Sequence, residues 1–592
     1  MSNILPINIE SKPEATNAAG FDLVGHKNGD FTRLKLFDAY GKLKPEFVNQ
    51  NVTVNNNSYS VDPKQIVPSE ALYNNPTETL AGDIIKRVDI NTGENVNYRE
   101  TTTWHDGSAM DDSKVDGVIY IKKNSKYYKR QIDGIVNIKW FGAKGDGITD
   151  DLPAFNAAVA FAKSVKGGKI FIPQGHYKFS DTWFLEDVSG LTIEGYCNQN
   201  ITFVDKSNST CLLDFDDCPK DHDGIRIEGF VGVEIKNIFI SYFRGIKGGT
   251  SITSNAALRF QKGHDYRITG VRINALGCAT TAGLILGGGT GEKTAFLGII
   301  DDVKVYCELQ SIGIGTFGGN TSLNFRSCYV AGGGYWHIEG TVYSTFLNCA
   351  CDGANHYGYL ITSNIYYNST NLSFISCGAE SCGKSGFWVY DYCQNIDFLN
   401  PYDANNNTSG NVNWGALMTI NADTWTKNIK IINPSSYSLN GTYSIAIHNF
   451  VDNIFIESTN AKNLRKPIGG NSLNKVSITG DFEWQPFTPT IEGATITSIN
   501  YIKAFWKRIG DGYELFLKID GDFTTTSGSS YIQLPFNVGN GIVNIVQLNM
   551  YAKPQMAVDV DKIYLPTMDI NTGDILTLSA KTTLVDKQIL GK

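Results

Sequence analysis

The 592-residue sequence predicts an all-β protein whose centre is a parallel β-helix, a stack of coils built from short strands. Three observations favour this fold class. The composition is rich in residues typical of strands and turns, including 60 Gly, 31 Phe and 29 Tyr. A short strand motif recurs between residues 324 and 436, and an amphipathic helix followed by Gly-Gly precedes the repetitive region. The length also exceeds one ordinary globular core, which favours a repetitive architecture or several domains.

The charge and hydropathy pattern argues against two classes of protein. The net charge is −8 and no dense Lys/Arg cluster occurs, so we expect no nucleic-acid partner, because such binding depends on neutralising phosphates. No apolar run reaches the roughly 18 residues of a membrane helix, so we expect no membrane insertion. Residues 1–10 carry no secretory signal pattern, which predicts synthesis in a cytosol and release by lysis or assembly.

The N-terminal part of the chain predicts two regions. In residues 1–45, short alternating segments at 20–29 and 32–36 are separated by Gly and Asn-Gly turns, which indicates a small β module. Residues 46–135 are polar and rich in turns, and we interpret them as a β-rich connector. Alternation on either side of Asn124-Ser125 predicts a hairpin in this connector.

The segment from Trp140 to Asp151 leads into the repetitive region. Beyond it, apolar residues recur at helical spacing and predict a helix over about 152–165, with Asp or Thr as its N-cap. Gly167-Gly168 then ends the helix, and residues 169–179 predict two short strands. We expect the helix to cap the end of the solenoid, where strand edges would otherwise be exposed. Asp150 and Asp151 are therefore interpreted as structural and not catalytic.

The repeated strand motif places an apolar residue at 325, 346, 374, 398 and 431, in steps of 21, 28, 24 and 33 residues. A constant strand with variable insertions is typical of a coil repeat. Because stacked strands lie about 4.8 Å apart, the four Phe residues of this series should form an internal ladder. Two further ladders are predicted at neighbouring positions: Cys328, Cys349 and Cys377, continued by Pro401 and Pro434, and Ser327, Asn348, Ser376, Asn400 and Asn433.

All eleven cysteines lie between Cys197 and Cys393, and their number is odd. No pair of CxxC motifs and no His/Cys cluster at zinc spacing occurs. We interpret the cysteines as small buried hydrophobic residues and predict no disulfide, no metal site and no cofactor.

The order of loop, helix, Gly-Gly, strand and Pro-x-Gly-x-Tyr across residues 140–179 resembles the entrance of the pectate-lyase-like β-helix in bacteriophage tailspikes. This resemblance implies a right-handed parallel β-helix over residues 136–475, a homotrimer and a place in the tail of the virion. Residues 1–45 are similar to small modules of phage tail fibres, which implies attachment of the N-terminal region to the tail, the baseplate or another tail protein.

The C-terminal region, residues 476–592, changes pattern again. Strict alternation over 513–519, beside an Asp-Gly turn, predicts antiparallel hairpins. The region resembles the antiparallel β-sandwich that closes several tailspikes and phage fibres, which implies a role in trimer formation, carbohydrate binding or both.

A solenoid has no internal cavity, so a substrate must lie along its outer surface or in a groove between protomers. Oligosaccharides bind to flat aromatic rings and to carboxylates or amides. The densest supply of such side chains lies between about 326 and 414. The predicted substrate-binding residues are Arg326, Tyr335, Trp336, His337, Glu339, His356, Tyr357, Trp388, Tyr390 and Tyr402.

Three carboxylates in this region are predicted to be catalytic: Asp352, Glu380 and Asp403. Asp352 and Glu380 each lie six residues after a ladder Phe, so they should be neighbours on successive coils, between Ala331 and Ala404, whereas Asp403 falls one place earlier. Two carboxylates roughly 5 Å apart should raise one pKa, which lets an acid and an ionised partner coexist. Such spacing suits retention in a glycosidase, whereas a pair of Asp352 and Asp403, two coils apart, would suit inversion.

Three functions remain open. The first is depolymerisation of a bacterial surface polysaccharide, capsule or O-antigen, by glycoside hydrolysis. The second is a polysaccharide lyase, in which Arg326, His337, Lys384 or Tyr390 would be the base that begins β-elimination at a uronate. The third is a non-catalytic adhesin that binds glycan through the same aromatic residues.

Overall fold

The computed structural model describes residues 84–480, apart from 198–208, 220–221, 243–254, 276–281, 289–293, 308–310, 364–365, 459–462, 467 and 473–474. On either side it describes strands, between residues 22 and 60 and between residues 485 and 583. The chain divides into two compact units. One comprises residues 1–135 and 139–143, and the other comprises residues 136–138 and 144–592.

The first unit is built from antiparallel strands. β1 (Asp22–Lys27) pairs with β2 (Asp30–Lys35), and β3 (Asn51–Val54) pairs with β4 (Asn57–Ser60). A four-stranded sheet has the order β5-β6-β8-β7 and contains β5 (Ile84–Val88), β6 (Asn95–Thr101), β7 (Tyr120–Lys123) and β8 (Lys126–Arg130). The predicted hairpin at Asn124-Ser125 is confirmed, since β7 and β8 meet there. Both turn residues have positive φ, 50° and 62°, as a two-residue turn of type I′ requires.

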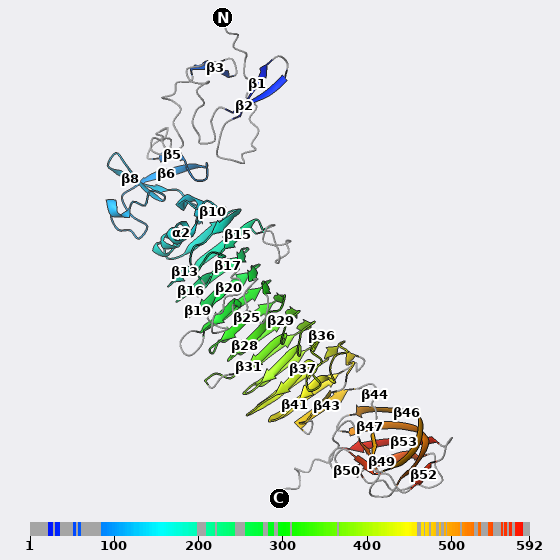
Figure 1. Ribbon diagram of the computed structural model, residues 1–592. Coiled ribbons are helices and arrows are strands. Elements are labelled where there is room, and N and C mark those ends of the chain that lie inside the picture. The colour runs from blue at the N-terminus through cyan, green and yellow to red at the C-terminus, as the bar shows by residue number, and fades with distance from the viewer. Residues whose placement is uncertain are drawn as a thin grey trace. The chain divides into compact units, whose positions relative to one another are not determined.

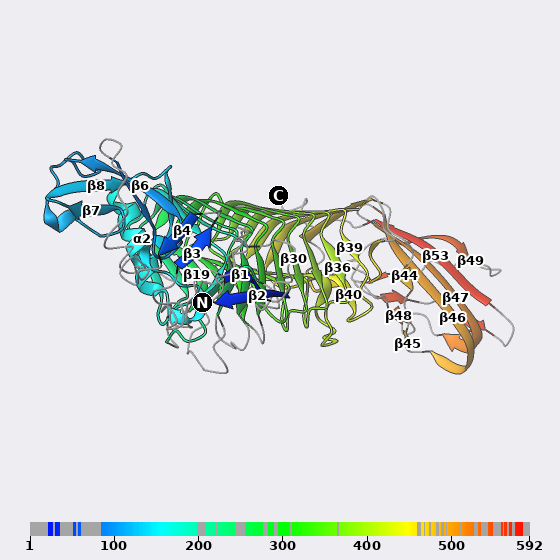
Figure 2. The ribbon, with the colours of Figure 1, turned by 90° about the horizontal axis from the view of Figure 1, so that it is seen from above.

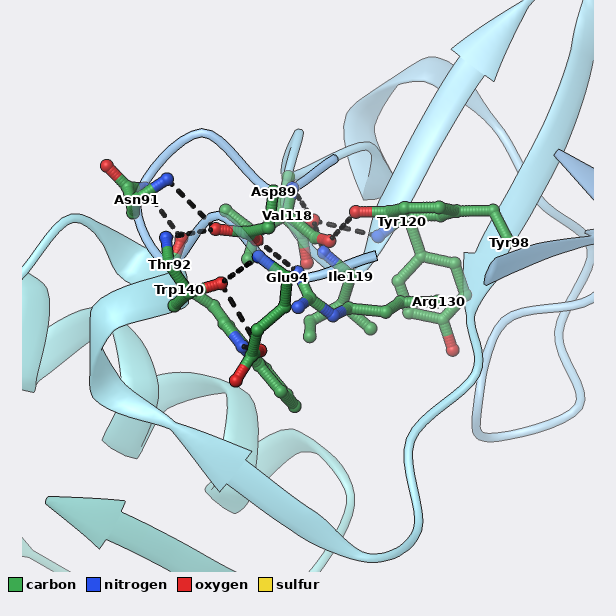
Figure 3. A network of polar contacts seen from close by, with 11 residues as sticks. Asp89, Asn91, Thr92, Glu94, Tyr98, Val118, Ile119, Tyr120, Arg130 and Trp140 are labelled. Carbon is green, nitrogen blue, oxygen red and sulfur yellow. Dashed lines mark hydrogen bonds and ion pairs between the residues drawn. The ribbon is translucent and has the colours of Figure 1, made fainter. Parts of the chain in front are cut away.

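A buried ion pair ties Trp140 to this four-stranded sheet (Figure 3). The guanidinium of Arg130 is 1% exposed, bonds to Asp89 Oδ2 at 2.6 Å, and lies 3.8 Å from the centre of the Trp140 ring. The Trp140 indole N–H also donates to Glu94 Oε2 at 3.3 Å. Removing either partner of a buried pair leaves an uncompensated charge, so we assign Trp140 and Arg130 a structural role.

After residues 136–138, the second unit continues with β10 (Asp146–Asp150) and the helix α2 (Leu152–Ser164), which confirms the predicted helix. Phe155 of α2 is fully buried and meets Phe179 and Trp183 edge-on, at 4.9 and 5.0 Å between ring centres. An Asp occupies the N-cap position, as predicted, but its side chain makes no capping hydrogen bond to the helix. The Asp151 carboxylate instead accepts from the backbone N–H groups of residues 144 and 145, at 2.6 and 3.1 Å.

The repetitive region forms a parallel β-helix of three sheets, whose coils are stacked in chain order from the end near α2 (Figures 1 and 2). Sheet I has 13 strands: β9 (Ile135–Asn137), β11 (Gly168–Ile172), β14 (Leu191–Gly195), β17 (Val231–Lys236), β20 (Gly263–Thr269), β23 (Ala295–Asp301), β26 (Asn324–Arg326), β29 (Val342–Leu347), β32 (Thr370–Ile375), β35 (Gln394–Leu399), β38 (Thr426–Ile432), β41 (Val451–Ser458) and β43 (Val476–Gly480).

Sheet II has 11 strands: β10, β12 (Gly175–Lys178), β15 (Cys211–Asp214), β18 (Phe239–Ser241), β21 (Arg272–Ala275), β24 (Lys304–Cys307), β27 (Tyr329–Ala331), β30 (Ala350–Asp352), β33 (Gly378–Glu380), β36 (Tyr402–Ala404) and β39 (Ser435–Ser436). Sheet III also has 11: β13 (Trp183–Glu186), β16 (Ile225–Glu228), β19 (Ala256–Gln261), β22 (Ala282–Gly287), β25 (Ile312–Phe317), β28 (Tyr335–Glu339), β31 (Tyr359–Thr362), β34 (Phe387–Tyr390), β37 (Gly415–Asn421), β40 (Tyr443–Ile447) and β42 (Ile468–Gly470).

The predicted aromatic ladder is confirmed inside sheet I. Phe325, Phe346, Phe374 and Phe398 are fully buried and stacked, with ring centres 4.8, 4.5 and 4.9 Å apart. A second ladder in sheet III, formed by Trp336, Tyr359 and Phe387, meets the first edge-on; its ring centres are 5.5 and 4.6 Å apart. The ten cysteines that the structure describes are free, and Cys349 lies between Cys328 and Cys377, as the cysteine ladder predicts.

The backbone conformation explains why polar residues recur at the predicted polar ladder. Ser327, Asn348, Ser376, Asn400 and Asn433 all have φ between 49° and 52°. Short polar residues tolerate this left-handed conformation better than other side chains, so each coil turns at one of them. A different polar ladder carries the side-chain bonds: Asn371, Asn395, Asn428 and Asn453 are joined in turn by amide bonds of 3.1, 2.9 and 2.8 Å.

The C-terminal strands form two antiparallel sheets. The six-stranded sheet contains β44 (Gln485–Pro486), β46 (Thr495–Ile509), β47 (Gly512–Thr525), β49 (Val543–Leu548), β52 (Met568–Ile570) and β53 (Ile575–Thr583). The four-stranded sheet contains β45 (Thr490–Glu492), β48 (Tyr531–Gln533), β50 (Val558–Asp559) and β51 (Lys562–Tyr564). The predicted hairpin is confirmed by the pairing of β46 with β47, while the sandwich stays a prediction. Among the described residues, no helix is long and apolar enough to cross a membrane.

Candidate functional site

The outer face of sheet II carries two neighbouring carboxylates. Asp352 ends β30 and pairs in register with Glu380, which ends β33, so the predicted register is confirmed. On the coils before and after this pair, the same position of sheet II is occupied by Ala331 and Ala404. The small alanine side chains leave the two carboxylates accessible, and Glu380 is exposed. We call Asp352 and Glu380 the carboxylate pair.

Tyrosines border the carboxylate pair on the same face. Two positions earlier in each strand, the side chains also face outward. On successive coils this position is occupied by Tyr329, Ala350, Gly378 and Tyr402. The Tyr329 hydroxyl donates to Asp352 Oδ2 at 3.1 Å. Burial and the neighbouring Asp352 charge raise the pKa of Tyr329, so this hydroxyl stays protonated and remains a donor. Tyr402 lies 5.8 Å from Tyr437 between ring centres, which extends the aromatic border.

The Tyr329 side chain was missing from the predicted site. It precedes Ala331 by two residues and so faces the same side of the strand, because side chains alternate along a strand. Extending the register of Asp352 back by one coil would have found it.

The structure corrects the prediction that Asp403 is catalytic. It pairs with Ala379 and Ser436, one position earlier than the carboxylate pair, and its side chain is fully buried inside the coil. Its carboxylate accepts from the Ser436 hydroxyl and from the backbone N–H of Asn406. Burial raises its pKa to about 6 despite these hydrogen bonds. Asp403 therefore has no access to a polymer outside the coil, and the inverting pair of Asp352 and Asp403 is withdrawn.

The structure also corrects the prediction that Trp336 binds substrate. It is fully buried in the ladder of sheet III, and its indole N–H donates to the carbonyl of Ala350 at 3.1 Å, so it supplies core packing and no sugar platform. Tyr335 is 6% exposed and stacks on His337 at 5.9 Å. Burial lowers the pKa of His337 to about 4, and its Nε2 lies 3.6 Å from Glu339 Oε2. These residues belong to sheet III, on a different face from the carboxylate pair.

Arg326 lies on the outer face of sheet I. Its guanidinium bonds to Asp301 Oδ2 at 2.7 Å, on the preceding coil. The structure therefore does not bring Arg326 together with the carboxylate pair of sheet II.

A third group combines three residues at the corners between sheets II and III, Tyr357, Lys384 and Trp414, with Trp388 of β34. Trp388 is 4.6 Å from Tyr357 and 5.7 Å from Trp414, measured between ring centres. The Lys384 ammonium lies 4.8 Å from the Tyr357 ring centre and 5.0 Å from that of Trp414. We call Tyr357, Lys384, Trp388 and Trp414 the aromatic cluster. His356 adjoins it, since its ring is 6.2 Å from Tyr357.

Tyr390, also on sheet III, donates its hydroxyl to Asp423 Oδ2. This hydrogen bond is the main reason that the pKa of Tyr390 is raised to about 12, so the hydroxyl is a poor base. Within the described ranges, no group of three or more His, Cys, Asp or Glu side chains is arranged to hold a metal ion.

One part of the chain matches a described protein family. Residues 135–379 match the family described as "Rhamnogalacturonase A/epimerase, pectate lyase-like". An uncharacterized 65.4 kDa protein of the cps region of Klebsiella pneumoniae is 37% identical over 89 residues, which are 14% of this chain and 15% of that protein. The mannuronan C5-epimerase AlgE3 of Azotobacter vinelandii is 47% identical over 49 residues, 8% of this chain and 3% of the epimerase. The chain therefore spans under a sixth of the length of either relative.

Among solved structures, the Dettilon tailspike protein gp208 is similar, with a TM-score of 0.40 and 14% identity over 76% of this chain and 95% of that chain. The parallel sheets of the β-helix confirm the predicted fold class in its main part. Residues 135–379 match a pectate-lyase-like family, as the entrance segment predicts.

Proposed function

We propose that this chain is a bacteriophage tailspike that binds the surface polysaccharide of a host bacterium and cleaves it by glycoside hydrolysis at the carboxylate pair. One observation carries this proposal. Asp352 and Glu380 are outward-facing neighbours on adjacent strands of sheet II, with tyrosines beside them. Two carboxylates beside aromatic rings are the groups that a glycosidase needs for chemistry and for sugar binding.

The spacing of the pair favours a retaining mechanism. Adjacent strands lie about 4.8 Å apart, near the separation of about 5–5.5 Å between the carboxyl groups of retaining glycosidases. We assign Asp352 as the nucleophile because the Tyr329 hydroxyl holds its Oδ2 in place. Glu380 is then the acid that protonates the leaving oxygen, and afterwards the base that activates water.

The remaining parts of the chain have supporting roles in this proposal. Residues 1–45 and 46–135 attach the protein to the phage tail, and residues 136–475 form the β-helix that binds and cleaves the polymer. Residues 476–592 support a homotrimer, carbohydrate binding or both. The protein then acts in the virion at the exterior of the host cell.

A polysaccharide lyase is the second candidate, favoured by two observations. Burial lowers the pKa of Lys384, which moves this amine toward the neutral form that a base requires. A short segment is also similar to a mannuronan C5-epimerase. A third reading, an adhesin, uses the same aromatic surfaces without cleavage.

One experiment separates these functions. Purified full-length protein is incubated with a panel of capsular polysaccharides and O-antigens, and reducing ends and ultraviolet absorbance are followed together. Hydrolysis predicts new reducing ends without absorbance from an unsaturated uronate. Absorbance that rises with the reducing ends would establish the lyase instead, and binding without any release would establish the adhesin.

A further inference from the structure

The Lys384 ammonium lies beside aromatic rings at the surface of the β-helix. Its nitrogen lies 4.8 Å from the ring centre of Tyr357 and 5.0 Å from that of Trp414, and Trp388 packs against both rings. All four side chains are half-buried, so the cluster is accessible from solvent while its charge is partly removed from water. Such rings stabilise a cation and can also stack on a sugar face.

Lys384 differs from many other lysines of the chain in its partners. Lys126, Lys169, Lys178 and Lys262 each pair with a carboxylate at 2.7 Å or less. Across the part of the chain that the structure describes, Lys384 has no carboxylate within 4.0 Å, and its hydrogen bond goes to the Tyr357 hydroxyl at 3.4 Å. A half-buried ammonium without a counter-ion is costly, and an external carboxylate would offset that cost.

The group next to Lys384 adds no second positive charge at neutral pH. His356 lies beside it, and the pKa of His356 is lowered by burial and then by the charge of Lys384. Burial likewise lowers the pKa of Lys384 itself, as expected for a cation that lacks an anionic partner.

The cluster adjoins the carboxylate pair along the chain and across the coils. Lys384 follows Glu380 by four residues, so the two Cα atoms lie within about 14 Å of each other. The corners of the two coils are stacked by backbone bonds, from Lys384 N–H to His356 O at 2.7 Å and from Gly383 N–H to Ala354 O at 2.8 Å. A polymer that crosses the corner can therefore contact both groups.

We propose that the aromatic cluster is a subsite for an acidic sugar, in which Lys384 binds the sugar carboxylate while Trp388 and Trp414 stack against the ring. This inference rests on the proposed function and narrows it, because it makes the substrate an acidic polysaccharide carrying uronic acid or pyruvate ketal groups. The Lys384 charge also offsets the repulsion between such a polymer and the carboxylate pair.

The test measures binding of acidic capsular polysaccharides to Glu380→Gln protein, in which cleavage is suppressed. Three further variants are made in this background: Lys384→Met, Lys384→Arg and Lys427→Met. Lys427 is the matched control, since it lies 5.2 Å from the Trp425 ring centre but on sheet I. Each polymer is used as isolated, after carboxyl reduction, and after mild acid has removed pyruvate ketals.

We expect Lys384→Met to weaken binding at least about tenfold, equivalent to about 1.4 kcal/mol, and Lys384→Arg to keep most of the affinity. Carboxyl reduction should weaken binding to the parent protein and leave Lys384→Met little changed. Mild acid should reproduce this loss if the carboxylate belongs to a pyruvate ketal and have no effect if it belongs to a uronic acid.

Three results would overturn the inference and leave the proposed function standing: preferred binding of neutral polymers, equal losses in Lys384→Met and Lys427→Met, or unchanged affinity of Lys384→Met. Failure to bind any polymer of the panel would instead contradict the proposed function itself.

Discussion

Asp403→Asn tests whether the buried carboxyl of Asp403 is structural. The side chain is fully buried, and its pKa is raised from 3.8 to about 6, first by burial. Because the folded-state pKa lies above the unfolded one, the folded state holds the proton more tightly. The unfolding free energy therefore falls as pH rises through this interval. About two pKa units at about 1.4 kcal/mol each amount to about 3 kcal/mol, present below a pH of about 4 and lost above about 6.

The assay compares urea unfolding of wild type and Asp403→Asn at pH values from about 3 to about 7, followed by tryptophan fluorescence. Asparagine has nearly the same shape and does not titrate, so other pH effects cancel in the difference between the two proteins. We expect the variant to gain about 3 kcal/mol relative to wild type between the acid and neutral ends. A difference that stays constant with pH would refute the reasoning. Loss of polysaccharide cleavage in the folded variant would return Asp403 to the active site.

Three other variants probe the core and the site. Phe374→Ala removes the centre of the ladder, where the rings of Phe346 and Phe398 stack at 4.5 and 4.9 Å, and should lower the unfolding free energy in urea by about 3–5 kcal/mol. Tyr329→Phe removes the donor to Asp352 and should reduce turnover about tenfold with an unchanged circular dichroism spectrum. The pKa of His337 is lowered from 6.5 to about 4, so wild type should lose about 3 kcal/mol relative to His337→Gln as pH falls from about 6.5 to about 4. Equal acid sensitivity of these two proteins would contradict the burial of a neutral imidazole.

The repeat made much of the fold predictable. A strand motif that returns every coil determines which residues stack, so the Phe ladder and the register of Asp352 with Glu380 followed directly from counting positions. The same count placed Asp403 one position earlier, and alternation along a strand turns that position inward. The offset was visible in the sequence, and its consequence for burial was missed.

Other features depend on contacts that a repeat does not encode. Trp336 was predicted as a sugar platform, but its neighbours in sheet III, Tyr359 and Phe387, stack with it in the core. The aromatic cluster draws Tyr357, Lys384 and Trp414 from corners of three different coils. Their insertions differ in length, so no spacing rule brings them together.

The asparagine ladder could have been predicted from the repeat, although it was not. Asn371, Asn395 and Asn428 each precede a ladder residue by three positions and have φ between 53° and 56°. The interval is constant, so the series was countable from the sequence. Its physical origin is the left-handed turn, which favours Asn, and the amide bonds between coils follow from that placement.

The central claim is that Asp352 and Glu380 cleave the polysaccharide, and turnover of Glu380→Gln tests it most directly. Glu457→Gln is the matched control, because Glu457 lies on sheet I, in register with Arg326 through the strands between them, and not on sheet II. Reducing ends are counted on the polymer that wild type degrades fastest. The account predicts that Glu380→Gln loses about 10²–10⁴-fold in turnover while it still binds the polymer, and that Glu457→Gln matches wild type. Unchanged turnover in Glu380→Gln would contradict the account.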